Sequence, residues 1–243
     1  MKLLVKAYGK KNIAELTPKM VLVTGTKRKP FWMKTYARTE KIKKPSIARE
    51  GSFNEDLLMA TKKQDIEGIW TALKQGANVN TRSKYDGKTP LINSISYKDD
   101  PYITKMLLDR GADPNLKDFH GWTPLMHASY NNKKNTAKLL LEYGADPNEQ
   151  NDLGVTALMH VSEKGNTDMA KLLLEHGAKP NLPNDGGATA LMYAVTYNKP
   201  DMVKLLLEHG ADVNIKDKEG DTAQSIARKK GYQDIMNLLL SHK

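Results

Sequence analysis

The sequence predicts a mostly α-helical solenoid of about six helix-turn-helix units, preceded by a small basic β-hairpin element. Three observations support this: a Gly-Ala-x-x-Asn segment that recurs with a period near 33 residues, a Gly-x-Thr segment with the same period, and an abrupt change of charge near residue 50. Two independent markers with one shared period indicate a repeat architecture, in which each unit buries its apolar face against its neighbours.

The charge divides the chain into two regions. Residues 1–50 contain fourteen Lys and Arg against three acidic residues, a net charge of +11, whereas residues 51–243 contain 24 basic and 25 acidic residues, a net charge of −1. The two sums reproduce the net charge of +10 for all 243 residues. We therefore predict a basic N-terminal element over 1–50 and a repeat domain over 53–243, with the boundary near Gly51.

In the basic element, two runs rich in β-branched and aromatic residues, 20–24 and 31–36, predict a β-hairpin around the turn 25–30, and residues 1–8 predict a third strand. Two interpretations stay open. The hairpin covers the open apolar side of the first repeat, or its cations form a surface for nucleic acid, an acidic protein or anionic lipid. The candidate polyanion-binding residues are Lys27, Arg28, Lys29, Lys41, Lys43 and Lys44.

The repeat markers follow in order along the rest of the chain. The Gly-Ala-x-x-Asn segments begin at Gly76, Gly111, Gly144, Gly177 and Gly210, and the Gly-x-Thr segments begin at Gly87, Gly121, Gly154, Gly187 and Gly220. Five copies with spacings of 33 to 35 residues predict five complete or nearly complete units.

One period shows why each element forms. Thr123 is placed to cap a helix whose first turn accepts Pro124, because the N–H that proline lacks would have no partner there. A second helix follows, with Leu140 and Leu141 at helical spacing. It ends at Gly144, which can adopt the left-handed conformation of a helix C-terminus, and an extended finger leads to the next unit.

This pattern resembles the ankyrin repeat, whose signature is a 33-residue period with Thr-Pro-Leu-His-x-Ala. The segments 89–91 and 123–125 match its Thr-Pro-Leu, and the three later copies have other residues in place of proline or leucine. The usual histidine is replaced by Ile92, Met126, Met159, Met192 and Ser225. The resemblance covers about residues 53–243. It implies stacked helix pairs and a function in binding other proteins through the turn tips and the concave face.

The ends of the array are atypical, as capping units should be. Residues 54–80 lack the Gly-x-Thr turn and predict two helices, around 57–62 and 65–74. The last unit has polar residues such as Gln224 and Ser225 at positions that are apolar in other units. The second unit has one extra residue around 99–101.

The recurrent polar residues are interpreted as structural. His127 and His160 occupy one slot of the repeat, and His176, His209 and His242 occupy another near the ends of helices, so we expect no shared metal sphere. His120 is not explained by the repeat. The asparagines Asn80, Asn115, Asn148, Asn181 and Asn214 are expected to bond backbone groups of adjacent loops.

The sequence contains no phosphate-binding loop, nucleophile elbow or His-Glu-x-x-His helix, and no cysteine. We therefore predict no catalytic residue, no metal site and no cofactor. The longest apolar run has six residues, against the roughly 20 of a membrane-spanning helix, and the first residues are too polar for a secretory signal. We expect a cytoplasmic monomer, with the nucleus or delivery into a host as alternatives.

Aromatic residues gather where ankyrin-like proteins usually bind. The positions −2, −1, +1, +9 and +10 from each Gly-x-Thr glycine make 25 sites; the 16 aromatic residues of the chain would place fewer than two there, and six occur. With one histidine, the candidate partner-binding residues are Tyr85, Tyr97, Phe119, His120, Trp122, Tyr130 and Tyr197. These side chains are typical interface anchors, unless the rings pack between repeats.

The sequence thus favours a non-enzymatic module that binds another protein through the concave face and turn tips of its repeats. The first alternative is a nucleic-acid-binding protein that uses residues 1–50, with the repeats as an adaptor. A third hypothesis is a small enzyme within residues 1–50, targeted by the repeats, for which Glu15, Glu40 and Glu50 are the available carboxylates.

Overall fold

A computed structural model describes residues 52–95, 99 and 101–242 of the chain, and these residues form helices and loops with no strand. The predicted hairpin and the six candidate polyanion-binding residues lie outside the described residues, as does Tyr97. The helices within the described part are α3 (Ser52–Lys63), α4 (Ile66–Lys74), α5 (Pro90–Ser94), α6 (Tyr102–Leu108), α7 (Pro124–Tyr130), α8 (Lys134–Glu142), α9 (Ala157–Lys164), α10 (Thr167–Glu175), α11 (Ala190–Thr196), α12 (Pro200–Glu208), α13 (Ala223–Lys230) and α14 (Gln233–Ser241).

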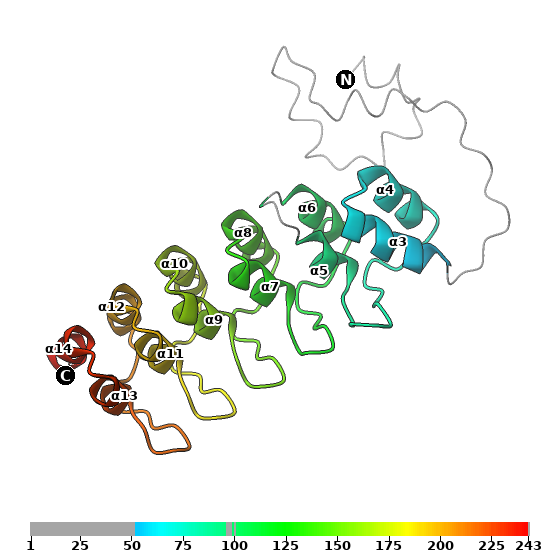
Figure 1. Cartoon of the computed structure of the whole chain (residues 1–243). Helices are drawn as coiled ribbons and strands as arrows, with labels where there is room; N and C mark the ends of the chain where they lie inside the picture. The colour runs from blue at the N-terminus through cyan, green and yellow to red at the C-terminus, as the bar shows by residue number, and fades with distance from the viewer. Residues whose placement is uncertain (1–51, 96–98, 100, 243) are drawn as a thin grey trace, which may run out of the picture. The chain divides into compact units, whose positions relative to one another are not determined.

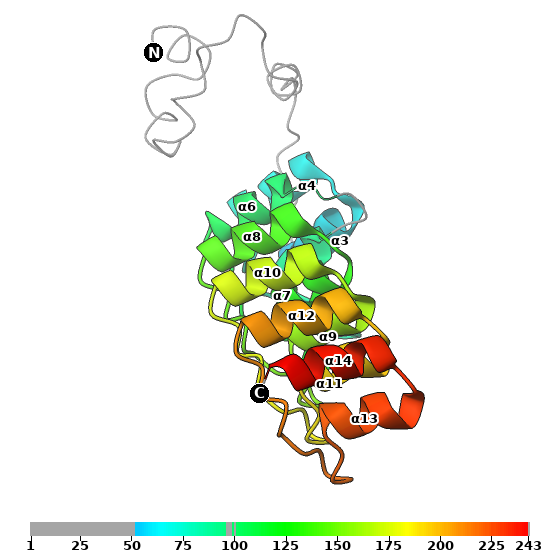
Figure 2. The same ribbon diagram turned by 90° about the vertical axis from the view of Figure 1, so that its left-hand side faces the viewer.

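The helices of residues 52–242 form six consecutive pairs arranged in two rows, as the sequence predicts (Figure 1). The odd-numbered helices form an inner row, and the even-numbered helices form an outer row, which faces the viewer in Figure 2. A loop joins each outer helix to the next inner helix and projects beside the inner row. These five loops, here called fingers, are residues 75–89, 109–123, 143–156, 176–189 and 209–222. The fingers and the inner row together form the inner face.

The inner helices α5, α7, α9, α11 and α13 begin as the sequence predicts. Before each of these helices, a threonine in extended conformation accepts a hydrogen bond from the backbone N–H three residues ahead, at 3.2–3.5 Å. The capping residues are Thr89, Thr123, Thr156, Thr189 and Thr222. Because this bond satisfies a donor that the helix leaves open, the threonine fixes where the inner helix starts.

Four of the five row asparagines connect adjacent fingers, which confirms the sequence prediction for Asn80, Asn115, Asn148 and Asn181. Asn214 differs, because it bonds to Asp212 within its own finger. Asn115 donates from Nδ2 to the carbonyl oxygen of Gly144 at 3.1 Å and accepts from the N–H of Asp146 at 2.8 Å. Asn148 repeats the pattern one unit later with Gly177 and Lys179. The bonds join residues about one repeat apart, so they hold each finger in register with the next.

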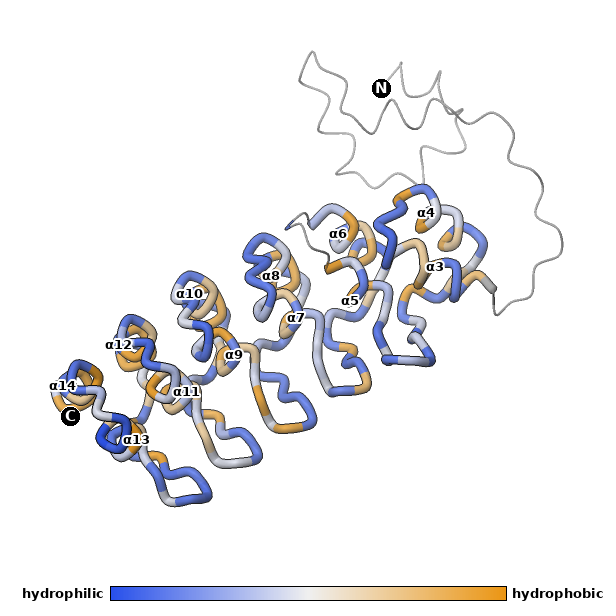
Figure 3. Tube along the Cα trace, in the orientation of Figure 1, coloured by the Kyte–Doolittle hydropathy of each residue, from blue (hydrophilic) through white to orange (hydrophobic). Residues whose placement is uncertain are grey.

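The core lies between the two rows and runs through the described units. Leu140, Leu173 and Leu206 occupy the same slot of three consecutive units, and each is fully buried. Figure 3 shows hydrophobic residues concentrated in the helices, whereas hydrophilic residues dominate the fingers apart from short hydrophobic stretches. The inner helix of the last described unit, α13, is mainly hydrophilic, as expected for a capping unit.

The extra residue of the second unit coincides with a contact that the sequence does not reveal. Lys133 precedes α8 and makes no side-chain cap bond. Instead, the carboxylate of Asp99, from the preceding unit, accepts from the backbone N–H groups of Asn135 and Thr136 at 3.0 and 3.1 Å, and from the Thr136 hydroxyl at 2.9 Å. The second unit therefore caps the outer helix of the third with a negative charge, which also suits the positive end of the helix dipole.

Candidate functional site

The structure places most of the candidate partner-binding residues on the inner face. The exposed fraction is 97% for Tyr85 and 54% for Phe119, both in fingers, and 43% for Tyr130 and 48% for Tyr197, at the ends of α7 and α11. His120 is exposed beside Phe119. The fifth described aromatic candidate, Trp122, differs: it is half-buried and packs against the core. Replacing Trp122 would therefore lower the free energy of unfolding as well as remove exposed aromatic surface.

Trp122 and Tyr130 belong to a compact group that spans the third and fourth units. The ring centroid of Trp122 lies 4.5 Å from that of His160, 5.2 Å from that of His127 and 5.5 Å from that of Tyr130. Tyr130 meets Trp122 and His160 edge-on, at interplanar angles of 79° and 81°. The ammonium of Lys164 lies 4.6 Å from the centroid of the Tyr130 ring. We call Trp122, His127, Tyr130, His160 and Lys164 the aromatic cluster.

The finger that precedes α7 holds one side of the cluster in place. Asp118 is buried, and its carboxylate accepts from the backbone N–H groups of His120 and Trp122 at 2.9 and 3.0 Å. It also accepts from Nε2 of His127 at 2.9 Å. Burial lowers the pKa of His127 despite the opposing effect of Asp118. A single carboxylate therefore fixes the finger, the indole and a neutral imidazole together.

His160 occupies the slot of His127 one unit later, but its surroundings are different. Burial, assisted by the positive charge of Lys164, lowers the pKa of His160 to about 4. Its buried Nε2 atom has no hydrogen-bond partner among the described residues. In the next unit the same slot holds Tyr193, whose hydroxyl accepts from Asn184 at 3.0 Å. His160 thus packs as a neutral ring against Trp122.

The low pKa of His160 makes the stability of the chain depend on pH. Between about pH 4 and its ordinary pKa of 6.5, the unfolded chain binds a proton that the folded chain does not, so the free energy of unfolding rises with pH over this window. The shift corresponds to roughly 1–3 kcal/mol. We expect His160→Gln to reduce the difference between urea unfolding free energies at pH 4.5 and 7.5 by about this amount. His209→Gln, at an exposed histidine, is the control, and equal pH profiles for wild type and His160→Gln would contradict the assignment.

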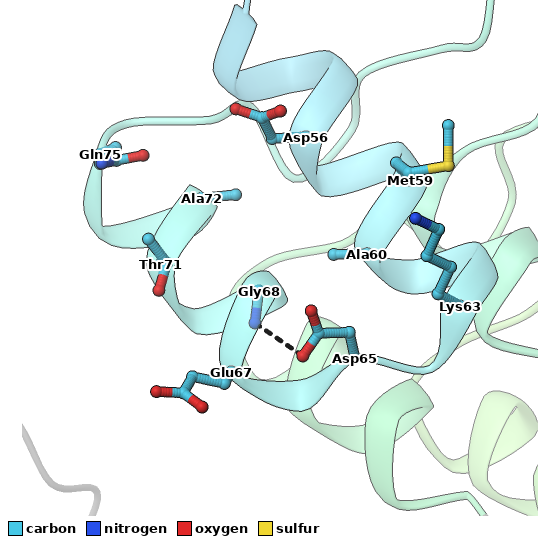
Figure 4. A pocket seen from close by; sticks show the side chains of 10 residues that line it. All are labelled: Asp56, Met59, Ala60, Lys63, Asp65, Glu67, Gly68, Thr71, Ala72 and Gln75. Carbon is cyan, nitrogen blue, oxygen red and sulfur yellow. Dashed lines mark hydrogen bonds between the residues drawn. The ribbon is translucent and has the colours of Figure 1, made fainter. Parts of the chain in front are cut away.

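A groove of about 520 Å³ lies elsewhere, on the first helical pair (Figure 4). Its floor is made of small residues, Ala60, Gly68 and Ala72, and its rim carries Asp65, which accepts from the N–H of Gly68 at 3.0 Å. That carboxylate is thereby occupied as the cap of α4. In the part of the chain that the structure describes, no group of three or more His, Cys, Asp or Glu residues could hold a metal ion.

Sequence reasoning found two members of the aromatic cluster as binding candidates, Trp122 and Tyr130, and interpreted His127 and His160 only as repeated structural residues. It missed Lys164. The signal that could have placed His127 and His160 near each other is their shared slot in the repeat, because equivalent slots of adjacent units lie side by side.

None of the described helices combines the length and the apolar character needed to cross a membrane.

Comparison with known proteins is consistent with this geometry. The family model for ankyrin repeats matches residues 57–151 and 143–217. A crystal structure of an ankyrin repeat domain from Acinetobacter baumannii AYE superposes with a TM-score of 0.70 and 32% identity, covering 76% of this chain and 96% of that one. The crystal structure of EF0377, an ankyrin repeat protein, gives a TM-score of 0.71 and 35% identity, covering 78% and 98%.

A curated relative matches only a short part of this chain. The human 2-5A-dependent ribonuclease is 36% identical over 76 residues, which is 31% of this chain. The matched segment spans only 10% of the length of that protein, so the likeness does not extend to the enzyme as a whole.

Proposed function

Because the chain belongs to the ankyrin-repeat family, a class of protein–protein interaction modules that is typically non-enzymatic, we propose that it binds a protein segment on its inner face around the aromatic cluster. The observation that carries this proposal is the partial exposure of aromatic rings there. Tyr130 is 43% exposed although three of its cluster partners are half-buried, and Phe119 stands 54% exposed on the adjoining finger.

The energetics favour these rings as anchors. Exposed aromatic rings that group on one face do little for a monomer, whereas Trp and Tyr supply much of the binding energy at protein interfaces. The edge-to-face contacts of Tyr130 with Trp122 and His160 fix its ring before any partner arrives. A ring that is already ordered loses little conformational entropy on binding, so rigid presentation supports affinity.

Selection of binding peptides from a displayed random-peptide library tests the proposal. The bait is the full chain, and the best peptides are then measured against two double variants. Phe119→Ala/Tyr130→Ala removes two exposed rings from the inner face, and Tyr102→Ala/Leu240→Ala removes two comparably exposed apolar side chains from the outer row. Trp122 is left intact because it also packs against the core.

We expect the inner-face variant to weaken peptide binding at least tenfold and the outer-row variant less than twofold, with both helical circular dichroism spectra unchanged. A tenfold loss is a moderate effect for two interface anchors. Equal losses in the two variants, no loss in either, or a library without binders would contradict the proposed function.

A further inference from the structure

The ammonium of Lys164 is held in an unusual place on the inner face. Lys164 ends α9, and its Nζ atom lies 4.6 Å from the centroid of the Tyr130 ring, which belongs to the preceding unit. A cation over an aromatic ring is attracted by the negative face of the ring, yet it keeps N–H donors directed away from it. The side chain is exposed, so these donors can meet a bound molecule.

Several charged side chains of the neighbouring fingers are paired. Asp118 is bonded to His127, Lys88 lies 3.8 Å from Asp86, and Lys117 lies 2.7 Å from Glu149. Within residues 52–95, 99 and 101–242, no carboxylate lies within the 4.0 Å of a salt bridge from Lys164. Glu163, its neighbour in sequence, projects from another side of the helix because adjacent helical residues do not face each other.

The two histidines of the cluster do not compete with Lys164 for an anion. Burial lowers the pKa of both His127 and His160, so their rings are neutral at neutral pH. Among the five residues of the aromatic cluster, Lys164 is therefore the one that carries a positive charge at neutral pH, and the other four are neutral rings.

Building on the proposed function, we propose that the bound protein segment places a carboxylate on the ammonium of Lys164 and an adjacent apolar side chain against Tyr130 and Trp122. The ammonium donates charge-assisted hydrogen bonds to the carboxylate, and the exposed part of the rings covers the apolar neighbour. The partner chemistry is thus an Asp or Glu side chain, or a terminal carboxylate, next to an apolar residue.

The test uses library-selected peptides on the full chain in a double-mutant cycle. On the protein side, Lys164→Met keeps the length of the side chain and removes its charge, while Lys164→Arg retains the charge. Lys171→Met, at an exposed lysine of α10, is the matched control. On the peptide side, each acidic residue is changed to its amide in turn, and a separate peptide has an amidated C-terminus, which distinguishes a side-chain carboxylate from a terminal one.

We expect Lys164→Met to weaken binding of the carboxylate peptide about tenfold or more and that of the matching amide peptide less than twofold. We expect Lys164→Arg and Lys171→Met to stay within about threefold of wild type. Selected peptides without a carboxylate, or equal losses for the carboxylate and amide peptides, would overturn the inference. The proposed function would survive that outcome if Phe119→Ala/Tyr130→Ala still weakened binding at least tenfold, so the two failures are distinguishable.

Discussion

Replacing Leu173 by Ala is expected to lower the free energy of unfolding by about 2–5 kcal/mol. The side chain is fully buried in α10, within the fourth of the six units, and has a folded unit on either side. The substitution removes apolar contacts and leaves a cavity, which the rigid helices on both sides can fill only in part. Urea denaturation followed by helical circular dichroism measures the loss.

Two further leucines make the result specific to the middle of the array. Leu239 is also fully buried, but it lies in α14, the last described helix, and among the described residues it has a neighbouring unit on one side only. Because a terminal unit can open before the rest, Leu239→Ala should shift the main transition less than Leu173→Ala does. Leu153, 67% exposed on a finger, should change it by less than about 0.5 kcal/mol when replaced by Ala. A Leu173→Ala value as small as that of Leu153→Ala would contradict the assigned repeat register.

The elements that the sequence predicts correctly are those fixed by local or periodic chemistry. Thr123 caps α7, and Gly144 has a φ of +85° at the end of an outer helix, since both roles depend on residues within one turn. The bonds of Asn115 join adjacent fingers, but the period of the repeat already places those fingers next to each other. Regular repetition thus turns a long-range contact into one that the sequence reveals.

Contacts that break the repetition cannot be predicted from the sequence. Asp99 caps α8 across more than a full repeat, and the only sign of it is one extra residue in the second unit. The aromatic cluster joins Trp122 of one unit to His160 and Lys164 of the next, and its geometry depends on side-chain rotamers that no period encodes. For the same reason, the sequence does not reveal that the Trp122 ring is half-buried while that of Tyr130 is exposed.

Adjacent fingers approach each other closely at Gly154. Gly154→Ala is therefore expected to lower the free energy of unfolding by about 2–5 kcal/mol. Gly154 has a φ of +71°, a conformation that costs an L-residue about 1 kcal/mol or more. An added Cβ would lie 2.6 Å from the backbone nitrogen of Asp185 in the next finger, so that finger has to move, at a further cost of roughly 1–3 kcal/mol. The same nitrogen donates to the carbonyl oxygen of Leu153 at 3.1 Å, and the movement would strain this bond.

Gly220→Ala is the matched control that separates the two contributions. Gly220 occupies the same slot in the last finger, with a φ of +81°, but an added Cβ would meet nothing within 4 Å because no described finger follows. We expect it to cost only the conformational part, about 1 kcal/mol. Urea denaturation of both variants measures the difference, and hydrogen exchange at the N–H of Asp185 should accelerate in Gly154→Ala alone. Equal losses at the two positions would show that the left-handed conformation by itself accounts for the glycine, and that contact between fingers contributes no stability to the inner face.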